Sequence, residues 1–328
     1  MPDLDLTIER DRLDRVRRGA AVVVDHPAVF RITGQGALTC LQGLFTNDLE
    51  QPGEGSLTYG AMLTPKGMIV ADAWIARHAG VLTLISPAQA REAVREIFQR
   101  GLPPRLARAE DATEESAVAW LLGERGFHTL AQSDIRTPEA SGRAVEHEGG
   151  TGTLVVALAP EGAPFAALLV GSAPAVDAAV RRLQIAGAMR AEQGDLHAAR
   201  ILAGWPALGV EIDEKTLPQE VRYDEIGGLS YTKGCYIGQE TVARVHFRGH
   251  TNRELRGIAW REPGPPGGRT VVAKEKEVGT VRSTLTVAGR TLGLALVRRE
   301  VEPGSDVVAG GRGATVVRLP FGGDELDG

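Results

Sequence analysis

Cysteine is scarce in this chain, because only Cys40 and Cys235 occur among its 328 residues. Two thiols so far apart do not form a disulfide framework, a CxxC zinc site or the four-thiolate shell of an iron–sulfur cluster. The HExxH, Walker and GxSxG patterns are also missing, which argues against zinc-protease, P-loop and α/β-hydrolase chemistry. We therefore expect no metal site, and at most one or two thiolates that could be lent to a shared cluster.

Long apolar runs and a strong charge of one sign are missing as well. No run approaches the roughly 18 residues that cross a bilayer, and the charged stretch at residues 1–19 lacks the layout of a secretion signal. The formal net charge of −5 gives no general attraction to nucleic acid or to anionic lipid. With its two unpaired cysteines, the chain is expected to be a cytoplasmic protein without a membrane partner.

The apolar pattern mixes strands and helices without a regular alternation of the two. Residues 21–34 carry a strand signal, and residues 57–77 are typical of two strands around the turn Pro65–Gly67. Cys40 falls in a short amphipathic segment, where it would be a small buried side chain. Further helices are predicted at residues 87–100, 173–187 and 191–204. This mixture predicts an α+β fold of mixed antiparallel sheets and helices rather than a doubly wound sheet.

The pattern changes after Arg253 to short apolar stretches separated by glycine, proline and charged turns. Such a pattern is typical of a small β-barrel or sandwich, which we assign to residues 251–328 as a C-terminal β-barrel domain. The rest, residues 1–250, would form the other region of the protein. We expect it to contain two subdomains, one made of residues 47–114 and one that joins residues 1–46 with residues 115–250.

One cysteine lies in the segment KGCYIGQE, Lys233–Glu240. Gly234 and Gly238 flank it, and glycines permit backbone conformations and close approaches that other residues do not. The pattern becomes helical from Gln239, so Cys235 would lie near a helix N-terminus, where backbone N–H groups favour the thiolate. Lys233 adds a positive charge nearby. A functional thiol and a structural cysteine that fills a tight turn are both compatible with this pattern.

A basic strip follows the cysteine and contains Arg244, Arg248, Arg253 and Arg256 together with His246 and His250. Arginine binds carboxylates and phosphates well. The strip would suit an acidic partner, a glutamate tail or an RNA such as tRNA. A solvated surface without a partner explains the same residues.

The segment Lys233–Glu240 resembles the K-G-C-[FY]-x-G-Q-E signature of the YgfZ family of folate-binding proteins, which is implicated in iron–sulfur cluster maintenance and tRNA modification. That family is similar to the T-protein (GcvT) of the glycine cleavage system, an aminomethyltransferase that uses tetrahydrofolate. The resemblance covers most of the chain outside residues 110–175. Its other segments are residues 34–48, 63–77, 200–212, 217–220 and 278–284.

The resemblance implies three compact domains around a central opening that holds tetrahydrofolate or a derivative, with the cysteine segment capping the cleft. It places Tyr59, Asp72 and Arg200 at the folate, with Asp72 near the position of the T-protein's catalytic aspartate. Leu202 stands where T-proteins carry a glutamate associated with pterin recognition, and leucine accepts no hydrogen bond. Cys235 would be the chemical centre. The rest of the motif would support it: Lys233, Gly234, Tyr236, Gly238, Gln239 and Glu240.

The function that the resemblance implies is that of a folate-binding protein which supports iron–sulfur cluster assembly or repair. Its partners would be iron–sulfur client proteins or assembly factors. Two alternatives stay open. One is a tetrahydrofolate-dependent aminomethyltransferase, a one-carbon transferase that would release ammonia from a lipoyl carrier. The other is a non-catalytic module that binds RNA or protein, for which tRNA binding would weaken steeply with salt.

Overall fold

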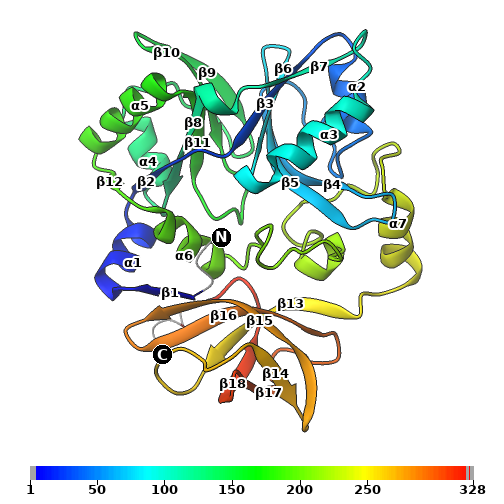
Figure 1. The fold of residues 1–328 in the computed structure, drawn as a ribbon. Helices are drawn as coiled ribbons and strands as arrows, with labels where there is room; N and C mark the ends of the chain where they lie inside the picture. The colour runs from blue at the N-terminus through cyan, green and yellow to red at the C-terminus, as the bar shows by residue number, and fades with distance from the viewer. Residues whose placement is uncertain (1–4, 323–324, 326–328) are drawn as a thin grey trace.

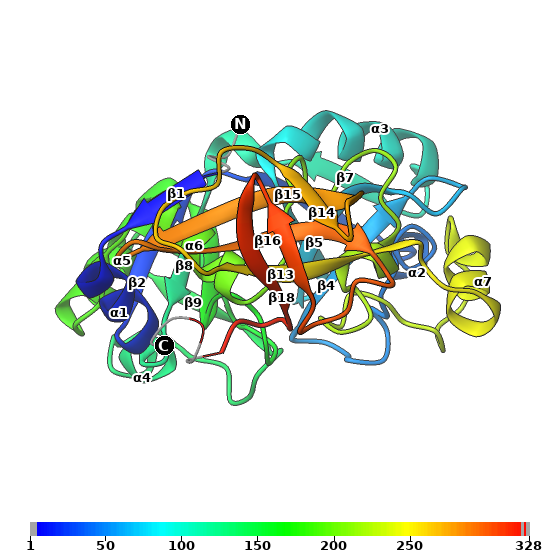
Figure 2. The same ribbon diagram turned by 90° about the horizontal axis from the view of Figure 1, so that it is seen from below.

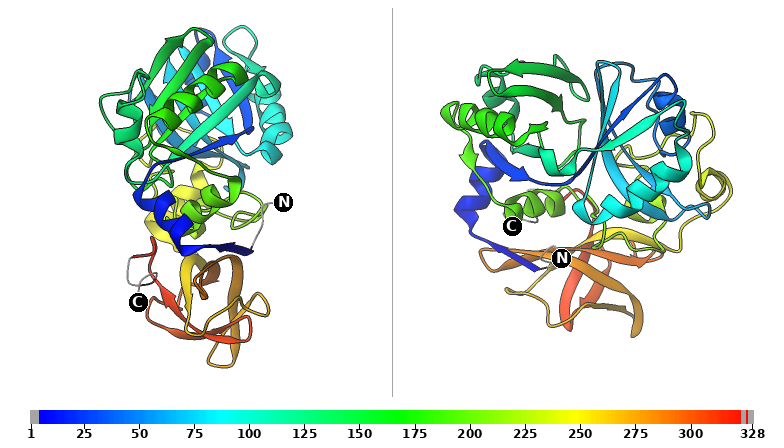
Figure 3. Two further views of the ribbon diagram at one scale, coloured as in Figure 1. Left: turned by 90° about the vertical axis from the view of Figure 1, so that its left-hand side faces the viewer. Right: turned by 45° about the horizontal axis from the view of Figure 1, so that its top comes forward.

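The computed structural model of the protein describes residues 5–322 and 325, and these residues form three β-sheets with helices around them. Figure 1 shows two of the sheets side by side in the upper half of the molecule and the third sheet below them. Residues 203–238, which include the 3₁₀-helix η3 (Pro218–Val221), run between the upper and the lower half. Figure 3 shows the same division from the side, and in the view from below the third sheet lies in front of the other two (Figure 2).

The first sheet is antiparallel and has five strands in the order β4-β5-β6-β3-β7. Every residue of β4 is buried, and the helices α2 and α3 pack on the sheet around Phe30, Phe45 and Phe98. The predicted pair of strands around Pro65–Gly67 is confirmed as β4 and β5. The elements are β3 (Ala28–Thr33), α2 (Ala37–Gln42), β4 (Ser56–Leu63), β5 (Ile69–His78), β6 (Val81–Ser86), η1 (Ala88–Ala90), α3 (Arg91–Gly101) and β7 (Arg108–Asp111).

The second sheet has six strands in the order β12-β2-β8-β11-β10-β9, antiparallel except for the pairing of β12 with β2. Strand β8 alternates between two cores: Ala119 and Leu121 face α5, whereas Val118 and Trp120 face the centre of the molecule. The elements are β2 (Ala21–Asp25), η2 (Thr113–Glu115), β8 (Ser116–Leu122), α4 (Gly126–Ala131), β9 (Ala144–Gly149), β10 (Gly152–Leu158), β11 (Ala167–Ser172), α5 (Ala173–Ile185), β12 (Met189–Arg190) and α6 (Gln193–Leu202).

The third sheet is the predicted C-terminal barrel. Six strands close in the order β15-β14-β17-β18-β13-β16, because β15 also pairs with β16. The N-terminal strand β1 (Asp5–Ile8) adds to β15 in parallel, which the sequence did not predict. Helix α1 (Arg10–Arg18) then packs on α6. The barrel strands are β13 (Arg253–Trp260), β14 (Thr270–Ala273), β15 (Lys276–Val287), β16 (Arg290–Arg298), β17 (Asp306–Ala309) and β18 (Arg312–Val317).

The strand signal at residues 21–34 is split by His26 and Pro27 into β2 and β3, which belong to different sheets. Proline lacks the N–H that a continuous ladder requires, so a break there is expected. Residues 28–46 therefore pack with the five-stranded sheet, and strand pairing favours a subdomain boundary near residue 27 instead of residue 46. The division of the chain into domains stays a proposal.

The predicted helix at residues 87–100 begins with the 3₁₀ turn η1 and becomes an α-helix only at Arg91. The predicted helices at residues 173–187 and 191–204 correspond to α5 and α6. Among the described residues, no helix is long and apolar enough to span a membrane. Residues 5–322 and 325 also contain no cluster of three or more metal-ligating side chains.

Candidate functional site

A cavity of about 540 Å³ lies where the two upper sheets meet α6. Its walls come from β4, β5 and β8, from α6, and from loops around residues 164–165 and 205–209. A cavity of this size is in the range that encloses a small organic ligand. The residues that surround it are far apart in the sequence, so the cavity exists only in the folded chain.

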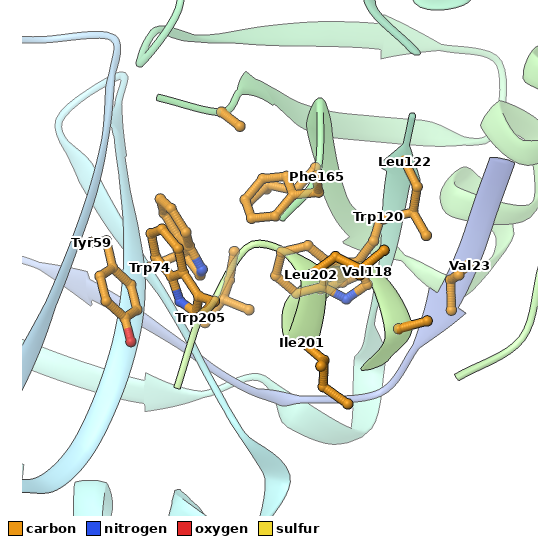
Figure 4. Close-up of a cluster of buried hydrophobic side chains, with 14 of the residues drawn as sticks. Val23, Tyr59, Trp74, Val118, Trp120, Leu122, Phe165, Ile201, Leu202 and Trp205 are labelled. Carbon is orange, nitrogen blue, oxygen red and sulfur yellow. The ribbon is translucent and has the colours of Figure 1, made fainter. Parts of the chain in front are cut away.

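Aromatic side chains form much of the wall (Figure 4). Trp74 stacks on Trp205 with ring centroids 5.6 Å apart and an interplanar angle of 16°. Phe165 meets Trp74 edge-on at 5.0 Å and Trp120 at 4.8 Å. Flat rings of this kind offer large contact areas at a small entropic cost, so they suit a planar ligand.

Asp72 of β5 lines the cavity and is 7% exposed. Its Oδ2 accepts a hydrogen bond from the hydroxyl of Tyr59 at 3.0 Å, and that hydroxyl is 3.1 Å from the hydroxyl of Tyr223. Burial raises the pKa of Asp72 to about 6, against the opposing effects of the Tyr59 hydrogen bond and the charge of Arg200. The carboxyl group can therefore change charge near neutral pH.

Arg200 of α6 lines the same cavity, and its guanidinium group is fixed by hydrogen bonds to neighbouring residues. Its Nη1 donates to Glu211 Oε2 at 2.7 Å and to the carbonyl of Trp205 at 2.9 Å. The other oxygen of Glu211 accepts from Ser283 of the barrel at 2.5 Å. These contacts fit a role of Arg200 in supporting the pocket better than a role in pairing with a folate carboxylate. Nothing in the local sequence pointed to Glu211.

Three polar atoms of cavity-lining residues are buried and have no hydrogen-bond partner among the described residues. They are the acceptor Asp72 Oδ1 and the donors Arg200 Nε and Trp120 Nε1. An unsatisfied buried polar group costs about 1–3 kcal/mol, so proteins rarely leave several of them together. All three belong to residues that line the cavity.

Leu202 is not one of the cavity-lining residues, although it is in the same helix as Arg200. Its side chain is buried in the central core near Val118 and Trp120 (Figure 4). This position therefore gives the cavity no polar contact. Tyr59, Asp72 and Arg200, in contrast, all line one cavity.

Cys235 is exposed and lies outside the cavity lining. No residue of the segment Lys233–Glu240 lines this cavity, and the segment packs instead on the end of α2 and on the β4–β5 turn. Helix α7 (Gln239–Arg248) begins just after Gly238, which has φ +84°. A Cβ on Gly238 would lie 2.7 Å from the carbonyl oxygen of Thr64, so only glycine fits against that turn.

Lys233 is buried, and its ammonium donates to the carbonyls of Gln42, Phe45 and Asn47 at 2.7, 2.7 and 2.8 Å. Burial lowers the pKa of Lys233 to about 8, against the opposing effect of the nearby charges of Asp48 and Glu50. The sequence predicts that this charge acts on Cys235. The side chain instead clamps the cysteine segment to the end of α2.

Replacing Lys233 with methionine is expected to lower the free energy of unfolding by about 2–3 kcal/mol, because three buried carbonyls lose a charged donor. Urea unfolding followed by circular dichroism measures this. The matched control is Lys66→Met in the exposed β4–β5 turn, which should stay within about 0.5 kcal/mol of the parent. A Lys233 variant as stable as that control would contradict the clamp.

The remaining motif residues differ in their surroundings. Tyr236 is buried under the Lys233 ammonium, 5.3 Å from its ring centre, and its hydroxyl has no described partner. Gly234 and Glu240 are exposed, and Gln239 is half-buried. Arg244 and Arg248 are exposed on α7 and, within residues 5–322, take part in no ion pair. Phe247 lies between them in sequence and is 67% exposed.

Comparison with known proteins gives three kinds of match. The GCVT N-terminal domain family matches residues 8–138. A protein named tRNA-modifying protein YgfZ, from Cronobacter sakazakii, is 26% identical over 287 residues, which is 85% of this chain and 84% of that protein. An aminomethyltransferase from Rubrobacter xylanophilus is 29% identical over 316 residues, which is 91% of this chain and 82% of that protein.

The crystal structure of the glycine cleavage system aminomethyltransferase T from Bartonella henselae has the same fold. It matches with a TM-score of 0.81 at 15% sequence identity, and the match covers 95% of this chain and 89% of that one. The α+β fold with a C-terminal barrel is thereby confirmed. Along most of its length the chain is similar to the YgfZ protein and to the aminomethyltransferase, and it shares the fold of the Bartonella henselae enzyme.

Proposed function

We propose that the protein binds a reduced folate, tetrahydrofolate or a derivative, in the central cavity. The observation that supports this most is the set of three unpartnered polar atoms, Asp72 Oδ1, Arg200 Nε and Trp120 Nε1, in the wall of one aromatic cavity. A pterin ring is planar and carries N–H donors and carbonyl and ring-nitrogen acceptors on its edge. It therefore fits both the flat walls and the polar atoms.

Binding can be measured by calorimetry and by tryptophan fluorescence. Three of the four tryptophans line the cavity, namely Trp74, Trp120 and Trp205, whereas Trp260 belongs to the barrel. Tetrahydrofolate should quench most of the emission with a dissociation constant in the micromolar range, for which about −8 kcal/mol is ordinary for a ligand of this size. p-Aminobenzoylglutamate, which lacks the pterin, is the control and should bind much more weakly. No heat and no quenching at millimolar tetrahydrofolate would exclude this function.

The finer proposal concerns the cysteine. We infer that the folate-bound protein supports iron–sulfur cluster assembly or repair in client enzymes, with Cys235 as the functional thiol. The thiol is free and exposed, and it lies close in sequence to the exposed apolar residues Ile237 and Phe247. A relative carries the name tRNA-modifying protein, so tRNA-modifying enzymes are among the clients to be tested.

Aminomethyltransferase activity is the second candidate, favoured by the Rubrobacter xylanophilus relative. Tetrahydrofolate-dependent release of ammonia from an aminomethylated lipoyl carrier would establish it. Leu202 opposes it, because this position offers no carboxylate to a pterin. A third reading, in which Arg244, Arg248 and Phe247 bind RNA or protein, requires binding of tRNA that weakens steeply between 50 and 200 mM salt.

A further inference from the structure

Tyr223 is a large, fully buried side chain that contacts the cavity wall through Tyr59. It is 0% exposed and does not line the cavity. The sequence brings it there through Arg222, which adopts a left-handed backbone conformation with φ +68°, and through Gly228, whose missing side chain leaves room for the ring. A Cβ on Gly228 would lie 2.5 Å from Tyr223 Cδ1. The fold thus makes a specific place for this phenol.

The Tyr223 hydroxyl lies 3.1 Å from the hydroxyl of Tyr59, which in turn lies 3.0 Å from Asp72 Oδ2. Each phenol has one proton to donate. When the Tyr59 proton goes to Asp72, the oxygen of Tyr59 can only accept from Tyr223. The three groups therefore form a directed chain in which Tyr223 donates to Tyr59 and Tyr59 donates to the carboxylate.

Both phenols keep their protons at neutral pH, because burial and the nearby Asp72 charge raise the pKa of Tyr59 and of Tyr223 well above the usual range. In a buried site, a donor that itself accepts a hydrogen bond is polarised and donates more strongly. The remaining ionisable groups around the cavity are Arg200 and His197 on α6 and Asp25 at the end of β2, and Glu211 neutralises Arg200 from behind. Apart from the backbone N–H of Asp72 itself, Tyr59 is thus the only uncharged donor to the Asp72 carboxyl group among the described residues.

We propose that Tyr223 is a positioning residue that acts through Tyr59 to hold Asp72 as a carboxylate, with Oδ1 left for an N–H group of the ligand. The inference rests on the proposed folate site for its ligand, but the effect on Asp72 exists without any ligand. Tyr223 does not line the cavity and so does not contact the ligand. It therefore affects ligand binding only through the charge and orientation of the Asp72 carboxyl group.

The test compares Tyr223→Phe, Tyr59→Phe and the double variant by carbon-13 NMR of the Asp72 carboxyl group in the ligand-free protein, with Asp72→Asn to assign the signal. We expect the midpoint of the titration to rise by about half a pH unit or more in Tyr223→Phe and by about one unit in Tyr59→Phe. Because Tyr223 acts only through Tyr59, adding Tyr223→Phe to Tyr59→Phe should shift the midpoint no further. Tyr231→Phe, whose hydroxyl bonds Asp224 instead, is the control and should leave the midpoint unchanged.

A second measurement uses tetrahydrofolate. In Tyr223→Phe its affinity should fall about threefold at pH 5, where a half-unit rise of the midpoint lowers the ionised fraction of Asp72 by that factor, and stay unchanged at pH 8.5, where Asp72 is ionised in either protein. An unchanged titration midpoint in Tyr223→Phe, or an additional shift in the double variant, would overturn the inference. If the parent protein binds no tetrahydrofolate, the proposed function fails, and the NMR titration still decides the role of Tyr223.

Discussion

Asp72→Asn is expected to make the ligand-free protein more stable at pH 7.5 while it weakens tetrahydrofolate binding by at least tenfold. The carboxyl group is buried and its pKa is raised from 3.8 to about 6, so the folded protein holds this proton between pH 4 and 6 when the unfolded chain has lost it. A raised carboxyl pKa contributes stability that is present below about pH 4 and is lost as the pH rises through 6. A shift of about two pKa units corresponds to about 2–3 kcal/mol.

The variant removes this pH dependence, since asparagine does not titrate. The free energy of unfolding of Asp72→Asn, relative to the parent, should therefore rise by about 2 kcal/mol between pH 4.5 and pH 7.5. Urea unfolding at the two pH values measures the difference. Asp177→Asn, an exposed change on α5, is the control and should show no such rise. The same pH dependence in parent and variant would show that the Asp72 charge does not lower stability. An unchanged folate affinity would show that the charge is not used in binding.

Cys235→Ser is expected to leave the fold intact and to abolish function in cells. The thiol is exposed, and its removal should change the free energy of unfolding by less than about 1 kcal/mol. In a strain that lacks its own relative of this protein, the parent chain should restore the activity of iron–sulfur enzymes. The serine variant should restore less than about a tenth of it, because a serine hydroxyl does not replace a thiolate as nucleophile or metal ligand.

The matched control is Cys40→Ser. Cys40 is half-buried and packs on the core of the five-stranded sheet, so its replacement should cost about 1 kcal/mol of stability while function is kept. Full complementation by Cys235→Ser would remove the thiol from the proposal. Unfolding of that variant would instead support the structural reading of the cysteine.

The sequence predicted local features well where a few neighbouring residues decide them. The β4–β5 pair follows from the alternation on both sides of Pro65–Gly67, and the start of α7 follows from Gly238, which supplies the positive φ that the helix cap needs. The break of the strand at Pro27 could also have been predicted from the sequence, because proline interrupts the hydrogen bonding between strands. It was missed because the apolar signal continues on both sides.

The site could be predicted only in part. Tyr59, Asp72 and Arg200 were found by resemblance, and the structure brings them to one cavity. The roles of Glu211 and Tyr223 depend on contacts with Ser283 and Tyr59, which are distant in sequence and leave no periodic pattern. Lys233 shows the opposite error: its nearness to the cysteine in sequence suggested an electrostatic partner, whereas its long side chain reaches carbonyls about 190 positions away.

The parallel pairing of β1 with β15 determines how late during synthesis of the chain this part of the fold can form. Asp5 pairs with Thr284, so 279 residues must be synthesised after the first before they can meet. At about 5–20 residues per second, this interval is roughly 15–55 s. The hydrogen bond between Ser283 and Glu211 also forms only after Ser283 has been synthesised. The Arg200 side of the cavity is therefore completed only as the barrel emerges, and a ligand that requires the finished cavity can bind only after synthesis has passed β15.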